Sequence, residues 1–94
     1  MSKVRKRHFR ALSRVERARM ALRLASDGRL RPVRELVALA GASPRGIVRW
    51  ITEGRSGVYL DALYDRERGW LSAPGAVQRF LREWQRQRRE RVKG

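Results

Sequence analysis

Two short runs of apolar residues at helical spacing lie between positions 30 and 54. The first run predicts a helix that begins near Pro32 and ends at Gly41. Its apolar stripe comprises Val33, Leu36, Val37 and Ala40, with Leu39 as a further candidate for burial. The second run predicts a helix over about 44–53, capped by Ser43 and followed by Gly54. The residues expected to face the core are Ile47, Trp50 and Ile51.

The second helix carries polar residues on a face that its apolar residues leave free. Arg45, Arg49 and Thr52 fall at i, i+4 and i+7. A helix-turn-helix requires this division, because its second helix packs on one side and reads the DNA major groove with the other. Alternatively, Arg49 belongs to a solvated face and pairs with Glu53, an interaction worth only about 0.3–0.5 kcal/mol.

A further helix is expected upstream, starting at Ser13. Ser13 and Glu16 have the spacing of a capping box, and Gly28 is suited to end the helix. The predicted packing stripe is Val15, Ala18, Leu22 and Ala25. The residues expected on the solvated face are Arg14, Arg17 and Arg23.

Alternating apolar residues over 58–64 predict a strand, and 65–69 a hairpin tip that leads into a return strand at Trp70. Ser72 is then expected to cap a last helix that has Pro74 in its first turn. The residues expected to pack this helix are Val77, Phe80, Leu81 and Trp84, and Trp70 is also expected in the core.

Together these elements predict a mainly α fold with a small β-hairpin: a winged helix-turn-helix preceded by an N-terminal helix. We expect a flexible basic arm over 1–12, the winged helix-turn-helix domain over 13–84, and a basic tail or helix extension over 85–94. Ninety-four residues suffice for one small core.

Charge adds a prediction about the partner. The formal net charge is +15, with 21 arginines among 24 basic residues. Residues 1–31 carry eleven basic and two acidic side chains, a net +9, and residues 73–94 carry seven and two, a net +5. The segment between them is nearly neutral, at +1 from six and five. A near-neutral centre between basic ends favours a folded module that grips a polyanion.

Several classes of function are not expected. There is no cysteine, and His8 has no second ligand nearby, so neither a metal nor another cofactor is predicted. No phosphate-binding loop or zinc-protease motif occurs, and the acidic group Asp61, Asp65 and Glu67 is typical of a solvated hairpin tip. We therefore expect no enzyme. The absence of a signal peptide or an apolar span predicts a cytoplasmic, nucleoid-associated protein without a membrane partner.

The helix-turn-helix segment carries Glu35, Leu36, Leu39, Gly41, Ser43, Ile47, Arg49, Trp50, Ile51 and Gly54, and the later pattern carries Gly57-Val58-Tyr59-Leu60 and Ser72 through Phe80-Leu81. With these residues, positions 30–84 resemble the excisionase and MerR-type winged-helix DNA-binding domains of small mobile-element and prophage proteins. Ala42 and Gly46 depart from that pattern, and Asp65 and Glu67 dilute the positive charge expected of the wing.

The resemblance implies sequence-specific binding of double-stranded DNA, either for transcription regulation or for DNA recombination, as an excisionase-like directionality factor. The predicted DNA-binding residues are Ser43, Arg45, Arg49, Thr52, Arg55, Arg66 and Arg68. The predicted nonspecific phosphate contacts are Arg5, Lys6, Arg7, Arg86, Arg88 and Arg89.

Two other classes of function remain open. Composition and arginine-rich ends suit a small RNA-binding protein of a ribosome or ribonucleoprotein equally well, and a fold retained only to bind another protein is a third possibility. Oligomeric state is also open, because the charge of +15 opposes association in solution whereas DNA could align several copies.

Overall fold

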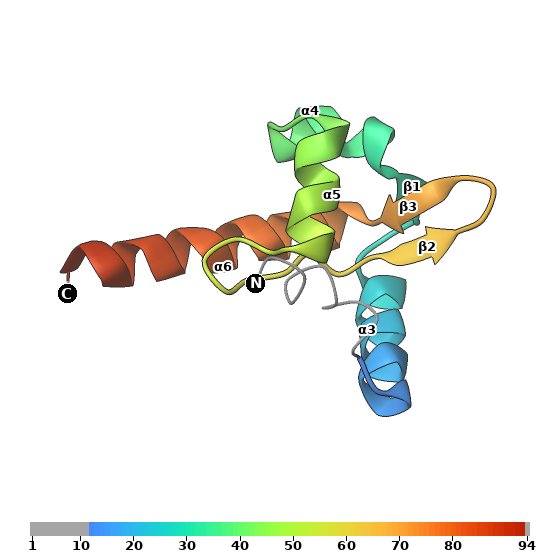
Figure 1. Cartoon of the computed structure of the whole chain (residues 1–94), viewed down its shortest axis with the longest axis horizontal. Coiled ribbons are helices and arrows are strands. Elements are labelled where there is room, and N and C mark those ends of the chain that lie inside the picture. The colour runs from blue at the N-terminus through green and yellow to red at the C-terminus, as the bar shows by residue number, and fades with distance from the viewer. Residues whose placement is uncertain (1–11, 94) are drawn as a thin grey trace.

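The computed structural model describes residues 12–93, which form a mainly α domain with a small antiparallel sheet (Figure 1). The elements in chain order are α3 (Arg14–Ser26), β1 (Arg31–Pro32), η1 (Val33–Leu36), α4 (Val37–Ala40), α5 (Pro44–Thr52), β2 (Leu63–Asp65), β3 (Gly69–Ser72) and α6 (Pro74–Lys93). The predicted fold class is therefore confirmed in its architecture, with an N-terminal helix, a helix pair, a hairpin and a last helix. The capping box of Ser13 and Glu16 is present at the start of α3.

The sheet has the strand order β1-β3-β2, and β1 was not predicted. Arg31 and Pro32 pair antiparallel with Ser72 and Leu71 of β3. Pro32 was expected in a first helical turn, and that expectation is wrong. It lies in an edge strand, where its missing N–H costs no ladder hydrogen bond, and the chain then enters the 3-10 turn η1.

The strand predicted over 58–64 is shorter in the structure, where only residues 63–65 pair with β3. The backbone groups before them have other partners. The Leu60 amide donates to the Trp50 carbonyl at the end of α5, and Val58 pairs with Arg55 in a tight turn. Leu60 and Ala62 are nevertheless buried, so the segment fastens α5 to the core without extending the sheet.

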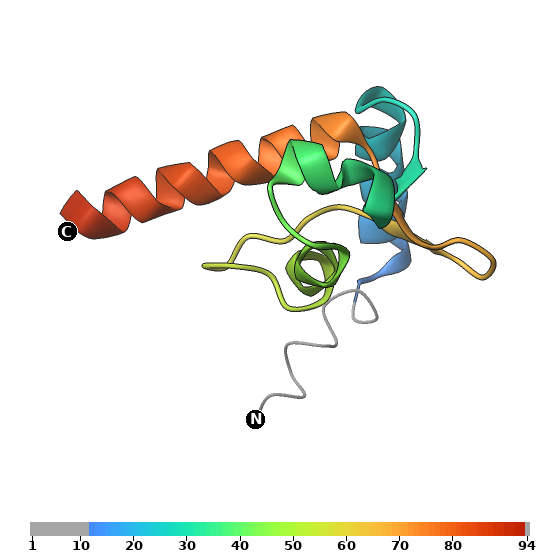
Figure 2. The ribbon, with the colours of Figure 1, turned by 90° about the horizontal axis from the view of Figure 1, so that it is seen from above.

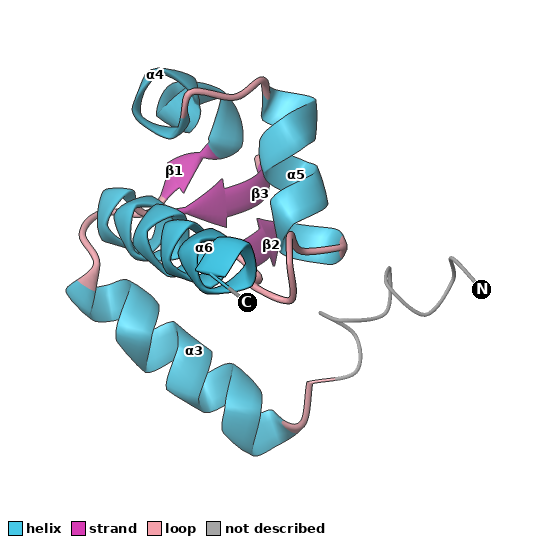
Figure 3. Cartoon of the chain, turned by 90° about the vertical axis from the view of Figure 1, so that its left-hand side faces the viewer, coloured by secondary structure: helices cyan, strands magenta, loops and turns pink. Residues whose placement is uncertain are grey.

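The core lies where the first turns of α6 pass between α3 and α4, as Figure 3 shows. Val77 and Phe80 of α6 are buried there together with Leu36 of η1 and Ile47 of α5. The Trp50 and Phe80 rings stack with centroids 4.7 Å apart, which joins α5 directly to α6. Leu39, a candidate for burial, is 41% exposed.

Helix α3 uses a different face from the one predicted. Met20 and Leu24 are buried, whereas Val15 is 58% and Leu22 71% exposed. Ala18 and Ala25 are exposed as well. The predicted stripe is therefore wrong, because the side of α3 that meets the body carries charged residues whose partners lie elsewhere in the chain.

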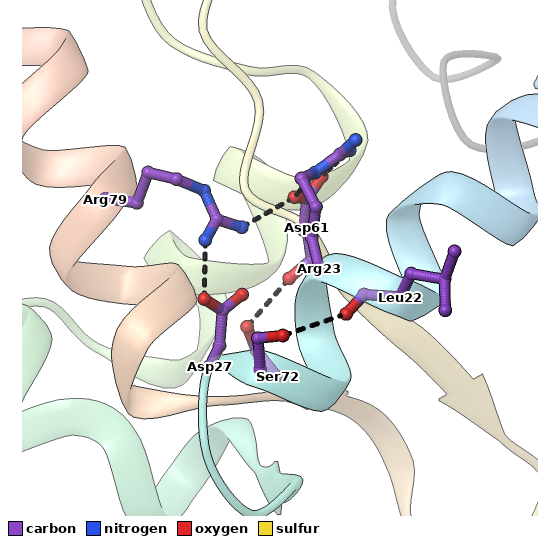
Figure 4. A network of polar contacts seen from close by, with 7 residues as sticks. Leu22, Arg23, Asp27, Asp61, Ser72 and Arg79 are labelled. Carbon is purple, nitrogen blue, oxygen red and sulfur yellow. Dashed lines mark hydrogen bonds and ion pairs between the residues drawn. The ribbon is translucent and has the colours of Figure 1, made fainter.

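Those charged residues form a polar network centred on Arg79 of α6 (Figure 4). Its guanidinium donates to Asp27 at the end of α3 (2.6 Å) and to Asp61 (2.8 Å). Arg23 of α3 also reaches Asp61, with its Nε 2.8 Å from Oδ2. Hydrogen bonds to the carboxylates raise the pKa of both arginines above the ordinary value.

Ser72 supports the same network and does not cap the last helix, so the predicted cap is wrong. The Ser72 side chain is fully buried in β3, and its hydroxyl donates to the Asp61 carbonyl (2.7 Å). Strand β3 continues through Ser72 to pair with β1, and α6 begins only at Pro74.

We expect Arg79→Met to lower the free energy of unfolding by about 1–3 kcal/mol, because Asp27 and Asp61 stay largely buried and lose a cationic partner. Urea denaturation followed by circular dichroism measures the effect. Arg23→Met should cost less, since Asp61 then keeps Arg79. Equal losses for the two variants would contradict the central position given to Arg79.

The start of α6 approaches the end of α3 so closely that only glycine fits at position 75. The Gly75 amide donates to the Asp27 carbonyl (2.8 Å), and a Cβ at this position would lie 2.7 Å from that oxygen. At Gly46 in α5, by contrast, a Cβ would meet its nearest neighbours at 3.5 Å, an ordinary contact.

These two helical glycines should therefore respond oppositely to alanine. We expect Gly75→Ala to lower the free energy of unfolding by about 1–3 kcal/mol through steric overlap. Gly46→Ala should raise it by up to about 1 kcal/mol, because alanine restricts the unfolded chain and favours helix. Thermal unfolding of both variants beside the parent protein checks the pair, and a loss of stability in Gly46→Ala would refute it.

Candidate nucleic-acid interface

Helix α5 follows a tight turn that fixes where it starts. Gly41 ends α4 in the left-handed conformation, with φ at 67°. Ser43 then caps α5 by accepting a hydrogen bond from the Gly46 amide (3.1 Å), and Pro44 occupies the first turn. The start of the helix is thus determined by local backbone chemistry, as the sequence predicted.

The two faces of α5 are separated as expected. Ile47 and Ile51 are at most 1% exposed, and Trp50 is 8% exposed. Arg45 and Arg49 are exposed one turn apart, and Arg49 lies 3.5 Å from Glu53 in the predicted i, i+4 pair. Because the Arg49 side chain is 69% exposed, this pair is weak and leaves the guanidinium accessible to an anion.

Thr52 is placed differently from the two arginines. It is half-buried, and its hydroxyl donates to the Val48 carbonyl (3.0 Å) within the helix. A contact of this hydroxyl with a base would require the loss of that bond. The polar surface that α5 offers to a ligand is therefore made mainly by Arg45 and Arg49.

A third arginine, Arg55, borders the exposed side of α5. Arg55 follows the helix in a turn closed by two backbone hydrogen bonds with Val58, of 2.8 and 2.9 Å. The two central residues, Ser56 and Gly57, have φ of 53° and 82°, a signature of a type I′ turn. Arg49 and Arg55 both line a surface groove of about 420 Å³ between α5 and this turn.

Trp84 of α6 lies beneath Arg55 and was predicted to be a core residue. Its indole is only half-buried, and the Arg55 guanidinium carbon lies over the ring, 4.1 Å from the centroid. Arg88 approaches the same ring at 5.5 Å. Sequence reasoning missed this cluster because Arg55 follows α5 whereas Trp84 and Arg88 belong to α6, and only the fold shows that these two segments meet.

The hairpin tip carries Arg66 and Arg68, both exposed. Asp65 shapes the tip: its Oδ1 accepts hydrogen bonds from the backbone amides of Glu67 (2.7 Å) and Arg68 (2.9 Å). The hydrogen bonds from the Arg68 and Glu67 amides lower the pKa of Asp65 below its ordinary value of 3.8. The acidic residue that dilutes the charge of the tip thus also determines its conformation.

Helix α6 continues well beyond the core, through the segment for which a tail or an extension was predicted. Arg82, Arg86 and Arg89 share one exposed face there. Arg86 donates to Glu83 (2.6 Å), and this hydrogen bond lowers the pKa of Glu83. In Figures 1 and 2 the extension and the hairpin tip project to opposite sides of α5.

Other parts of the chain offer fewer candidates. Arg5, Lys6 and Arg7 lie outside the described residues. Asp61, grouped with Asp65 and Glu67 in the sequence, points instead into the network around Arg79. Within residues 12–93 no three histidine or acidic side chains gather into a potential metal site. Across the same residues, no helix has the length and apolar character needed to cross a membrane.

No known protein family, curated protein or solved structure matches this chain. The interface must therefore be evaluated from its own geometry and charge.

The Asp65 turn gives a pH-dependent prediction. Because folding lowers the pKa of Asp65, the carboxylate stabilises the fold above the unfolded value of 3.8, and this contribution is lost as the pH falls through the lower folded value. Asp65→Ala should therefore unfold at a lower urea concentration than the parent protein near pH 6, and the difference should shrink toward about pH 2.

Glu67→Ala is the matched control at the same tip, since the hydrogen bond at this residue uses its backbone amide. Its urea midpoint should follow the parent protein at both pH values. A deficit of Asp65→Ala that persists unchanged in acid would contradict the assigned role of the carboxylate.

Proposed function

We propose that this chain is a non-enzymatic DNA-binding protein of the winged helix-turn-helix type. In this proposal α5 enters the major groove, the β2–β3 hairpin acts as the wing, and α6 contacts the flanking backbone. The observation that carries it is the division of α5 into a buried face with Trp50 and an exposed face with Arg45 and Arg49.

The surroundings of α5 support the proposal. A helix in the major groove needs phosphate contacts on either side to fix its register, and those contacts come mainly from arginine and lysine. The hairpin tip supplies Arg66 and Arg68 on one side, and the extension of α6 supplies Arg88 and Arg89 on the other. The helix pair followed by a hairpin and a last helix is also the order predicted for a winged helix-turn-helix, to which the structure adds the short strand β1.

The biological role that follows is control of transcription or direction of site-specific recombination. Both require a small protein that recognises a duplex sequence, and the element order and charge distribution are compatible with either. Self-association of several copies along one duplex is part of the same proposal, because bound phosphates would offset the repulsion between chains of charge +15.

The test is fluorescence anisotropy with a labelled random-sequence duplex and a length-matched structured RNA, over roughly 50–300 mM salt. We expect Arg45→Ala/Arg49→Ala to weaken duplex binding by about tenfold or more, because α5 then loses both of the exposed cations with which it can contact the DNA backbone from the groove. The preference for duplex DNA over RNA should decrease in the same variant.

Arg14→Ala/Arg17→Ala is the charge-matched control, since both residues are exposed in the first turn of α3, and the N-terminal end of that helix points away from α5 in Figure 1. It should lower duplex affinity much less. If both double variants lose affinity equally, binding reflects net charge alone. If the parent protein binds RNA as tightly as the duplex, and if neither double variant changes these affinities, the DNA-reading role of α5 is wrong.

A further inference from the structure

The groove between α5 and the turn at 55–58 has the properties of an anion site. Arg49 and Arg55 line it together with Gly46 and Gly54, which have no side chain to obstruct access. Within residues 12–90, no carboxylate lies within ion-pair distance of Arg55 or Arg88, whereas Arg79 and Arg86 have such partners. Arg49 has only a weak, exposed pair with Glu53 at 3.5 Å, so most of the positive charge beside the groove is uncompensated.

The position of Arg55 is restricted twice. Its backbone is closed into a turn by paired hydrogen bonds with Val58, so the Cα has little freedom. Its guanidinium then lies over the indole of Trp84 at 4.1 Å. A guanidinium held by its flat face keeps the N–H groups along its edge free to donate, which suits recognition of a phosphate.

Arg88 brings a second cation to the same indole, at 5.5 Å. Arg88 does not line the groove itself, but it adds a second positive charge beside Arg55, which favours binding of an anion near both. The indole thereby joins the turn after α5 to the extension of α6, which otherwise lie in separate parts of the chain.

We propose that this groove binds one phosphodiester of the DNA backbone and that Trp84 is a positioning residue, which holds Arg55 and Arg88 ready for that phosphate. The inference rests on the proposed DNA-binding function and adds to it a defined phosphate site beside α5. Trp84 itself does not contact the phosphate in this arrangement; it acts through the two arginines.

The experiment is a double-mutant cycle with the full chain. The affinity for duplex DNA is measured for each variant at several concentrations of an inorganic salt. We expect Arg55→Ala to weaken binding about 3- to 10-fold. The negative slope of log K against log salt should become shallower by about 0.9, the value for one phosphate contact. Trp84→Leu should cause a similar loss, and the double variant should be little worse than either alone.

Two conservative variants separate positioning from folding. Trp84→Phe keeps an aromatic face and should remain within about twofold of the parent protein. Arg55→Lys keeps the charge but not the planar guanidinium, and should lose at least about threefold. Because Arg55→Lys leaves Trp84 in place, it remains informative even where Trp84→Leu is too unstable to assay. Urea denaturation of each variant verifies that it is folded under the binding conditions.

The outcomes distinguish this inference from the proposed function. If the losses from Arg55→Ala and Trp84→Leu multiply, or if Arg55→Lys binds like the parent protein, the positioning role is overturned while dependence on Arg45 and Arg49 can persist. If Arg55→Ala lowers the salt slope no more than Arg17→Ala on α3, the phosphate site is overturned. A parent protein without duplex preference overturns both proposals.

Discussion

The placement of the helices depends on one guanidinium, that of Arg79. It donates simultaneously to Asp27 at the end of α3 and to Asp61 in the segment that follows α5. Two parts of the chain that are far apart in sequence therefore meet at a single side chain of α6. Ion pairs at a surface are usually worth little, but here the carboxylates are only 10% and 17% exposed, so their charges require this partner.

The exposed face of α5 follows from that convergence. Two contacts fix the segment after α5. Asp61 accepts a hydrogen bond from Arg79, and the Leu60 amide donates to the Trp50 carbonyl. Trp50 in turn stacks on Phe80, one residue beyond Arg79 in α6. With these contacts made, Arg45 and Arg49 can lie only on the outer side of the helix. A change in the network is thus expected to alter the presentation of the candidate interface as well as stability.

Sequence patterns predicted the parts of the fold that depend on local chemistry. The capping box at Ser13, the turn at Gly41 and the apolar face of α5 involve residues within a few positions of one another. The patterns failed where a distant partner decides the outcome. Val15 and Leu22 were assigned to the core, but both are exposed. The side of α3 that faces the body is instead the one with Arg23 and Asp27, which bind Asp61 and Arg79. The same holds for Ser72, which resembles a helix cap locally but is bound to the Asp61 carbonyl.

Net charge alone likewise overstates what a polyanion would encounter on this protein. The formal charge is +15, yet Arg23 and Arg79 bind carboxylates of distant segments, and Arg31 and Arg86 have acidic neighbours three or four positions away in sequence. Only the fold shows which cations remain available. Among the described residues they include Arg45 on α5 and the pair around the indole of Trp84. If the chain binds DNA as proposed, the salt dependence should report a number of phosphate contacts well below the total count of basic side chains, because counterions leave the DNA only where a cation of the protein neutralises a phosphate.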